Sequence, residues 1–382
     1  MSQLDTYIIE NPNVKNTICA ALWSHARVTV EGTVTPCCRY NHHKQSEQPK
    51  LKDGIGAALK SDFFEDVRRK MLNGEYVKEC QQCYDEEKSG RRSMRTGLND
   101  RYSSNILNEP KILFLETAFS SHCNLACRMC NETASSKWKL IKNPGTKVDV
   151  ELDGNDVVYY DDTDLSELEL VKMVGGEPLL DKNHHINLDK FISQSKNPEN
   201  IKLTYHTNGT VFPNKNILDY WRQVHTVNLV FSIDAYGELN DYLRPGSSWE
   251  TLTNNILKLK ELKDINFKFN THSVVSNISI WKLHKLIEWK KETFNGDIGG
   301  YFVLDGPMHM SIKNMSSEIK EKIKAYLVDH NIESYSWLYK MININLEKPP
   351  EIEPLNFSDI QKYMKQLDAY FGQNFWENIN DT

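Results

Sequence analysis

The chain has 382 residues, of which 39% are hydrophobic and 26% are charged, and its formal net charge is −6 at pH 7. Without a basic excess, a dedicated nucleic-acid-binding protein is not expected. The N-terminal residues show no basic segment followed by an apolar core, and the longest apolar runs are strand-sized. Neither a secretory signal nor a membrane span is therefore expected, and we expect a cytoplasmic protein with one large or two smaller domains.

The first 100 residues differ in character from the rest of the chain. Residues 26–38 alternate apolar and polar side chains around Glu31–Gly32, which predicts a β-hairpin. Residues 61–74 have helical periodicity and end at Gly74, a typical helix stop. Residues 91–110 are interpreted as a linker. We therefore expect a small domain over residues 1–100.

Eight cysteines stand at positions 19, 37, 38, 80, 83, 123, 127 and 130. In a reducing compartment such a set is better explained by metal ligation than by disulfides. Five of them fall in the N-terminal region, including the Cys-x2-Cys pair Cys80 and Cys83. Thiolates in this number suit tetrahedral zinc as well as an iron–sulfur cluster, and either metal would stabilise a small cysteine-rich domain.

From residue 111 onward, short apolar segments alternate with amphipathic helices. Strands are predicted over residues 111–118, 168–178, 201–209, 227–235, 267–275 and 299–307, and helices over 183–195, 213–224, 249–263 and 279–294. Pro213 is expected in a first helical turn. The alternation predicts an α/β fold with a mostly parallel sheet buried on both faces. Ligand-binding groups are expected at the carboxyl ends of the strands.

Three cysteines follow the first of these strands: Cys123, Cys127 and Cys130 have Cys-x3-Cys-x2-Cys spacing. A 4Fe–4S cluster takes one thiolate per iron, so three thiolates leave one iron open to an outside ligand. This spacing resembles the signature of the radical S-adenosylmethionine superfamily. Members usually have an aromatic residue before the third cysteine, whereas this chain has Met129, which we interpret as a packing residue.

A second motif stands at the end of the second predicted strand, where the superfamily carries its Gly-Gly-Glu motif. It comprises Gly175, Gly176, Glu177 and Pro178. Glycines allow a ligand to approach the backbone closely, and a carboxylate can pair with the ammonium of a methionine moiety. By resemblance, the amino and carboxylate groups of S-adenosylmethionine chelate the open iron while Glu177 holds the amino end.

Later strand ends fit the same resemblance. It implies that Asn208 follows the third strand at the site, that Ser232 and Asp234 contact the ribose, and that Arg244 binds the cosubstrate carboxylate. Val274 and Val275 would flank the adenine. Plain alternatives are a strand-end turn for Ser232 and Asp234 and a surface or capping role for Arg244. His184 and His185 are expected to be solvated.

The N-terminal cysteines resemble the first part of the SPASM motif or its shortened form, the twitch domain, although these domains usually follow the barrel. This resemblance implies one auxiliary iron–sulfur cluster, of the 4Fe–4S type, ligated by Cys19, Cys37, Cys80 and Cys83, with Cys38 as a spare. The fold implied is a partial (β/α)6 barrel over residues 108–310 with a twitch- or SPASM-like domain before it and a helical extension over residues 311–382.

The function implied is reductive cleavage of S-adenosylmethionine to a 5′-deoxyadenosyl radical that abstracts a substrate hydrogen. The auxiliary cluster would accept an electron, a reductant such as flavodoxin or ferredoxin would supply one, and a peptide or protein would be modified. The alternatives are a small-molecule dehydrogenase of the sugar-alcohol type, a non-catalytic zinc scaffold and a two-cluster electron carrier.

Overall fold

The computed structural model describes residues 3–41, 48–88, 90–142 and 163–379. Among these residues, eight strands form one sheet in the order β2-β1-β3-β4-β5-β6-β7-β8. Every neighbouring pair is parallel except β1 and β2. The strands are β1 (His25–Val28), β2 (Val34–Thr35), β3 (Phe114–Ala118), β4 (Leu170–Val174), β5 (Lys202–Thr207), β6 (Thr226–Ser232), β7 (Phe267–Val275) and β8 (Gly300–Val303). All six strands predicted after residue 110 are confirmed.

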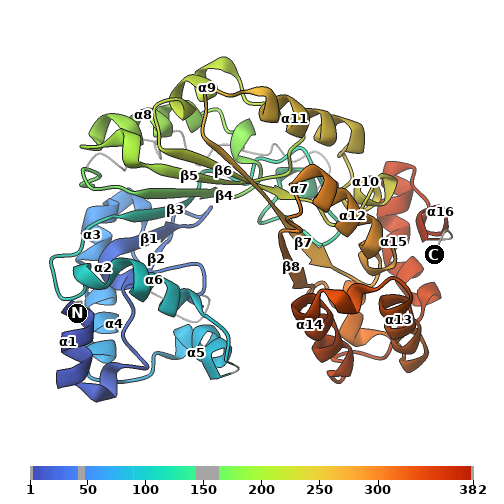
Figure 1. Cartoon of the computed structure of the whole chain (residues 1–382), viewed down its shortest axis with the longest axis horizontal. Helices are drawn as coiled ribbons and strands as arrows, with labels where there is room; N and C mark the ends of the chain where they lie inside the picture. The colour runs from blue at the N-terminus through green and yellow to red at the C-terminus, as the bar shows by residue number, and fades with distance from the viewer. Residues whose placement is uncertain (1–2, 42–47, 89, 143–162, 380–382) are drawn as a thin grey trace.

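Helices cover the convex side of this curved sheet, where α8, α9 and α11 lie in a row (Figure 1). The helices of the barrel region are α7 (Ser136–Lys142), α8 (His184–Gln194), α9 (Lys215–Trp221), α10 (Glu238–Leu243), α11 (Trp249–Glu261) and α12 (Leu283–Thr293). The four predicted crossover helices are thus confirmed. Pro213 precedes the N-cap residue Asn214 instead of lying in the first turn of α9.

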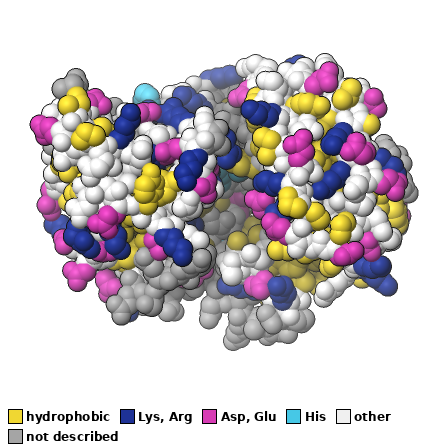
Figure 2. All heavy atoms as spheres, turned by 90° about the horizontal axis from the view of Figure 1, so that it is seen from below, with side chains coloured by type: hydrophobic (Ala, Val, Ile, Leu, Met, Phe, Trp, Pro, Cys, Tyr) yellow, Lys and Arg dark blue, Asp and Glu magenta, His cyan; other side chains and the backbone are white. Residues whose placement is uncertain are grey.

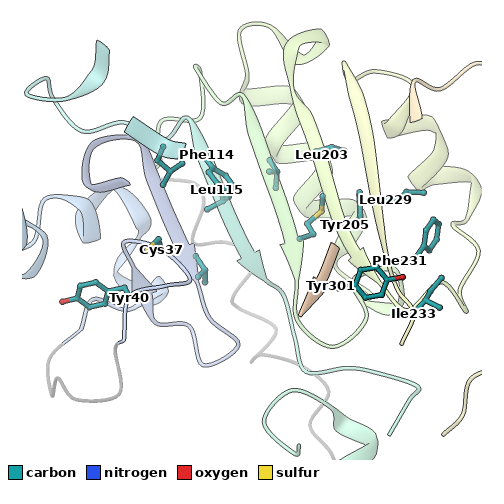
Figure 3. Close-up of a cluster of buried hydrophobic side chains, with 14 of the residues drawn as sticks. Cys37, Tyr40, Phe114, Leu115, Leu203, Tyr205, Leu229, Phe231, Ile233 and Tyr301 are labelled. Carbon is teal, nitrogen blue, oxygen red and sulfur yellow. The ribbon is translucent and has the colours of Figure 1, made fainter. Parts of the chain in front are cut away.

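The two faces of the sheet differ in side-chain chemistry. Along β5 and β6, buried residues, most of them apolar, alternate with more exposed and mostly polar ones. Leu203, Tyr205, Leu229 and Phe231 belong to the apolar face and pack together (Figure 3). The expectation of a sheet buried on both faces is therefore wrong for the concave face, because an open barrel leaves its inner wall accessible.

The N-terminal hairpin does not stand apart from the barrel, because β1 pairs in parallel with β3. The predicted hairpin is confirmed, and the predicted helix corresponds to α4, which is followed by Gly74 in the left-handed region at φ 76°. The helices of this region are α1 (Gln3–Glu10), α2 (Ala21–Ser24), α3 (Ile55–Leu59), α4 (Asp62–Leu72), α5 (Gln81–Lys88) and α6 (Met94–Tyr102).

Helix α6 occupies the segment that was interpreted as a linker, so that interpretation is wrong. Ser93 and Thr96 form a capping box that starts the helix. The Arg95 guanidinium donates to Ile18 O at 2.9 Å, and Asn99 Nδ2 donates to the same carbonyl at 3.0 Å. The polar composition suggested a linker, whereas these side chains satisfy buried backbone groups.

Helices alone form the described part of the C-terminal segment beyond residue 316, as expected. They are α13 (Ser317–Asp329), α14 (Ser336–Glu347), α15 (Phe357–Phe371) and α16 (Phe375–Ile379). The chain has the outline of an arch, with the sheet at the top and the N-terminal and C-terminal helices as its two legs (Figure 1). The concave face of the sheet opens between these legs.

Candidate active site and auxiliary cysteine cavity

The predicted cysteine triad lies in the loop between β3 and α7. Cys123, Cys127 and Cys130 are free thiols, and each is half-buried. Burial raises the pKa of Cys123 to about 11 and that of Cys127 to about 12. The charge of Arg244 lowers both values in part. Cys123 and Cys130 also act on the pKa of Cys127, so the three thiols share one electrostatic environment.

The start of α7 holds this loop in place. The Cys123 amide donates to Ser136 Oγ at 3.1 Å, and Ser136 Oγ donates back to Cys123 O at 3.2 Å. Trp138 Nε1 donates to Cys127 O at 2.9 Å, and Ser135 Oγ donates to Leu125 O at 2.7 Å. The backbone on both sides of the thiols is therefore tied to one helix.

The glycine motif brings the end of β4 against the same loop. Gly175 has φ 118°, and a Cβ on Gly176 would lie 2.1 Å from His122 O. The Gly176 amide donates to Ser120 O at 3.0 Å, and the Glu177 amide donates to His122 O at 2.7 Å. No side chain fits at Gly176, and this close approach places the Glu177 carboxylate beside the cluster loop.

Glu177 is the buried acid of the site, with 1% of its surface exposed. Its carboxylate accepts hydrogen bonds from the Asn208 amide at 2.7 Å, Thr207 Oγ1 at 2.8 Å and the Leu179 amide at 3.2 Å. Burial raises the pKa of Glu177 to about 7, although these three donors oppose the shift. Pro178 begins the 3₁₀ turn Pro178–Leu180.

Asn208 links this acid to the cysteine loop, as its place after β5 predicted. Its Nδ2 donates to Asn124 Oδ1 at 3.0 Å and lies 4.0 Å from Cys123 Sγ. Asn124 Nδ2 in turn donates to Thr210 Oγ1 at 2.9 Å. The ends of β3, β4 and β5 thus meet at one edge of the sheet.

Two further predicted residues form a buried ion pair. Arg244 Nη2 lies 2.7 Å from Asp234 Oδ2, and Arg244 Nη1 lies 3.6 Å from Cys127 Sγ. Asp234 Oδ1 accepts the Val274 amide at 2.8 Å. Arg244 is therefore not a surface residue. Ser232 ends β6, opposite His272 in the strand register.

The donor set fits the groups that the cysteine spacing implies. In the described ranges, no three or more His, Cys, Asp or Glu side chains are arranged to hold a metal ion. A 4Fe–4S cluster binds each thiolate through a different iron, which does not require the sulfurs to converge on one point. Three free thiols beside a buried carboxylate suit such a cluster with an open iron and an amino-acid ligand.

The other four predicted ligands line one small cavity in the N-terminal region. Its walls are formed by Cys19, Cys37, Arg39, Cys80, Cys83, Met94, Arg95 and Leu98. Burial raises the pKa of all four thiols, that of Cys19 to about 12. Arg95 pairs with Glu87 and lowers the Cys19 value in part. Ligands from residues 19 to 83 are thus brought together by α2, the hairpin and α5.

Cys38 lies outside this cavity. Its Sγ is 3.6 Å from Met94 Sδ, and Met94 lines the cavity on the other side. Burial raises the pKa of Cys38, and the next largest influence is the charge of Glu116 on β3. The spare cysteine is therefore near charged residues of the barrel sheet and is not among the residues that line the cavity.

A polar row on the concave face was missed by the sequence analysis. Glu116 Oε1 lies 3.4 Å from Arg27 Nε, and Glu116 Oε2 lies 3.1 Å from Lys172 Nζ. Farther along, the rings of His206 and His272 lie 5.8 Å apart. Burial lowers the pKa of His206 to about 4, with Lys172 as the next cause. The sequence signal that could have revealed this row is that polar residues recur at every second position of the strands.

The prediction that His184 and His185 are both solvated is wrong for His184. His184 is buried, and its Nε2 lies 2.9 Å from the Tyr205 hydroxyl, whereas His185 is exposed. His184 starts α8 and faces the sheet, so its ring serves the outer core. Met129 packs against the core, as predicted.

Two protein-family models match the chain. Residues 117–289 match the radical SAM superfamily, and residues 19–84 match the SPASM iron–sulfur cluster-binding domain. The parallel sheet and the cysteine loop lie within or next to the first of these ranges, in agreement with the radical SAM match. Residues 117–289 therefore form a radical SAM domain, and a region that matches the SPASM domain, residues 19–84, precedes it in the chain.

Individual relatives are distant. An uncharacterized protein from Methanocaldococcus jannaschii is 25% identical over 277 residues, which cover 69% of this chain and 87% of the relative. The structure of anSMEcpe with bound AdoMet is 17% identical with a TM-score of 0.43, covering 59% of this chain and 62% of that one. Streptococcus suis SuiB bound to S-adenosylmethionine is 15% identical with a TM-score of 0.36, covering 67% and 52%. The chain spans less than two thirds of either structure.

The cofactors follow from the two family matches. The radical SAM domain implies a 4Fe–4S cluster and S-adenosylmethionine, and the SPASM domain implies auxiliary iron–sulfur ligation. The iron–sulfur alternative for the N-terminal cysteines is thereby supported over zinc. In the part of the chain that the structure describes, no helix is sufficiently long and apolar to span a bilayer.

Proposed function

We propose that this chain is an enzyme that cleaves S-adenosylmethionine reductively and modifies a peptide or protein by hydrogen abstraction. One observation carries the proposal: the cysteine triad, Glu177 and the Arg244–Asp234 pair meet at the carboxyl ends of the parallel strands. When bound, the cluster supplies the electron that splits the cosubstrate into methionine and the 5′-deoxyadenosyl radical.

The residues around the triad would hold the cluster and the methionine moiety of the cosubstrate. Cys123, Cys127 and Cys130 would hold the cluster. The buried Glu177 carboxylate would pair with the cosubstrate ammonium, a charge-assisted contact in a site that excludes water. Arg244 would contact the carboxylate. The remaining proposed contacts are made by Gly175, Gly176, Pro178, Asn208, Ser232 and Asp234.

The concave face of the sheet is the proposed substrate site. Figure 2 shows the molecule hollowed between its two halves, on the side where the concave face opens. Arg27 and Lys172 are each about a quarter exposed, so their charges remain available to a ligand. An opening between two legs can admit an extended chain, which supports a peptide or protein substrate.

The auxiliary site would lie at the other end of this face. Four thiols lining one cavity fill every position of a cubane, which supports electron transfer in place of substrate ligation. Cys38 contacts Met94 of the cavity wall, and the charge of Glu116 in the polar row acts on its thiol. We propose the division 1–100, 108–310 and 311–382 into auxiliary, radical and helical parts, with flavodoxin or ferredoxin as reductant.

The test is anaerobic incubation of reconstituted protein with S-adenosylmethionine and dithionite. Wild type should release 5′-deoxyadenosine, Cys127→Ala should release none above background, and Cys38→Ala should release as much as wild type. Equal release by wild type and Cys127→Ala would refute the proposal.

A small polar substrate is the second candidate, and the polar row favours it. Carboxylate, guanidinium, ammonium and imidazole groups within one row can hydrogen-bond several hydroxyls. A screen of polyols and peptides for stimulated 5′-deoxyadenosine release separates the two candidates. Stimulation by polyols alone would support the second.

A further inference from the structure

The C-terminal helices contact the cluster-binding loop through one buried arginine. Arg128 follows Cys127 directly, and its side chain is 0% exposed. Its Nη2 donates to Asp368 Oδ1 and to Gln373 Oε1, each at 2.7 Å. Both partners belong to the end of α15 and the turn after it, more than 235 residues away along the chain.

The same guanidinium also holds the segment before Arg244. Arg128 Nε donates to Tyr242 O at 2.7 Å, and the guanidinium carbon lies 3.8 Å from the centre of the Tyr242 ring. The Arg128 amide donates to Leu243 O, and the Ala126 amide donates to Pro245 O, each at 2.9 Å. The loop backbone is thus paired with the residues on both sides of Arg244.

The Asp368 carboxylate, which accepts a hydrogen bond from Arg128, is itself held in place. Asp368 Oδ2 accepts the Phe375 amide at 3.1 Å, and Gly372 ends α15 in the left-handed conformation at φ 64°. Gln373 Nε2 donates to Asp241 O at 3.4 Å. The turn between α15 and α16 therefore presents a rigid pair of acceptors to the loop.

An apolar contact accompanies these polar ones. Ala126, Ile141 and Leu367 form a small buried cluster, against which Trp138 and Phe371 pack. It lies between α7 and α15, apart from the main core. The loop is consequently enclosed by α7 on one side and by α15 on the other.

We propose that the turn between α15 and α16 is a positioning element of the radical SAM site, with Arg128 as its positioning residue and Asp368 as its anchor. This inference rests on the proposed function. It assigns a role to the C-terminal extension, in which the sequence showed no chemistry. Arg128 touches no reacting atom. It acts by holding Cys127 and Arg244 in one relative arrangement, in which the two would hold the cluster and the cosubstrate.

The test compares Arg128→Met and Asp368→Asn with wild type. Arg128→Lys is the conservative variant, which keeps the charge but loses the fork of donors. Lys362→Met is the matched control, because Lys362 lies on α15 and makes only a surface pair with Asp359. All proteins are reconstituted anaerobically, and the auxiliary cluster in the same chain is an internal reference for folding.

The spectroscopic readout is the paramagnetic resonance signal of the reduced radical SAM cluster and its change on adding S-adenosylmethionine. Arg128→Met and Asp368→Asn should keep the auxiliary signal, lose most of the cosubstrate-induced change and bind the cosubstrate at least tenfold more weakly. Arg128→Lys should fall between them and wild type. Lys362→Met should match wild type.

A second readout needs no cofactor. Hydrogen–deuterium exchange of the Ala126 and Arg128 amides in cluster-free protein should be at least tenfold faster in Asp368→Asn than in Lys362→Met. Unchanged exchange and an unchanged spectrum would overturn the inference. Loss of both clusters together would also overturn it, by showing a general folding role. A wild type without a cosubstrate-induced change would instead count against the proposed function, while the exchange result still decides the inference.

Discussion

Arg244 and Asp234 form a buried ion pair in which two guanidinium nitrogens, Nε and Nη2, lie within 2.8 Å of one carboxylate oxygen. The arginine side chain is 11% exposed and the aspartate side chain is fully buried. Asp234 also accepts a backbone amide from β7. This pair therefore connects the end of β6, the end of β7 and the cysteine loop, and it leaves Nη1 facing Cys127.

Arg244→Met should weaken both stability and cosubstrate binding. Removing one partner leaves the Asp234 charge buried without compensation, which costs about 3–5 kcal/mol. Denaturant unfolding and equilibrium dialysis with S-adenosylmethionine measure the two effects. Arg222→Met, which removes two exposed ion pairs, is the control. Equal stability of the two variants would contradict the pairing.

Glu177 should make the stability of cluster-free protein fall as the pH rises. Its folded pKa of about 7 lies above the ordinary value of 4.5, so the folded protein keeps a proton that the unfolded chain releases. Its contribution is fully present below pH 4.5 and is lost as the pH rises through 7, by on the order of 3 kcal/mol. Urea unfolding at pH 5 and pH 8 should show this loss in wild type and a smaller one in Glu177→Gln.

Gly176→Ala should disrupt the contact between β4 and the cluster loop. An added methyl group would lie 2.1 Å from His122 O, a backbone atom that cannot move alone. We expect roughly 3 kcal/mol of destabilisation and loss of cosubstrate binding. Gly97→Ala within α6, where the nearest atom lies 3.7 Å away, should be neutral or stabilising. Thermal unfolding and dialysis distinguish the two.

Cys80→Ala and Cys38→Ala should differ in metal content. Cys80 lines the auxiliary cavity and Cys38 does not. Cys80→Ala should lose up to about four irons per chain and unfold at lower temperature, because metal binding stabilises a cysteine-rich region. Cys38→Ala should keep the wild-type iron and sulfide content. The reverse result would place Cys38 among the ligands.

Lys172→Met should raise the pKa of His206. This pKa is lowered to about 4, mainly by burial and next by the charge of the nearby Lys172 ammonium. Removing the cation leaves the burial effect, the smaller effect of His272 and the opposing effect of Glu116, so the pKa should rise toward its ordinary value. Nuclear magnetic resonance titration of labelled histidines measures the change. Lys202→Met, at the exposed start of β5, should leave it unmoved.

Much of the fold was predictable because strands and crossover helices carry local periodicities. The six strands after residue 110 and the four crossover helices were found from pattern alone. The sequence pattern did not predict α6, because two of its polar residues have a role that only the fold explains. Arg95 and Asn99 donate hydrogen bonds to the carbonyl of Ile18, a residue distant in sequence. The pattern also failed at His184, because the direction in which a helix start faces depends on packing.

In the candidate site too, some features could be predicted from short segments and others depend on the fold. Cysteine spacing and Gly175–Glu177 are short-range motifs, so a single segment reveals each of them. The pairing of Asp234 with Arg244 and the reach of Arg128 to Asp368 join segments separated by 10 and 240 residues. Neither contact has a local signal.

The sequence alone pointed to thiolate-ligated metal chemistry, since thiol number and spacing limit which cofactors a chain can hold. Only the tertiary structure showed that the hairpin extends the barrel sheet and that the last helices contact the cluster loop. The physical reason is that these features depend on contacts between residues far apart in the sequence. Ligand chemistry is a property of individual side chains, whereas partners in a folded chain are chosen by packing and by the need to satisfy buried charge.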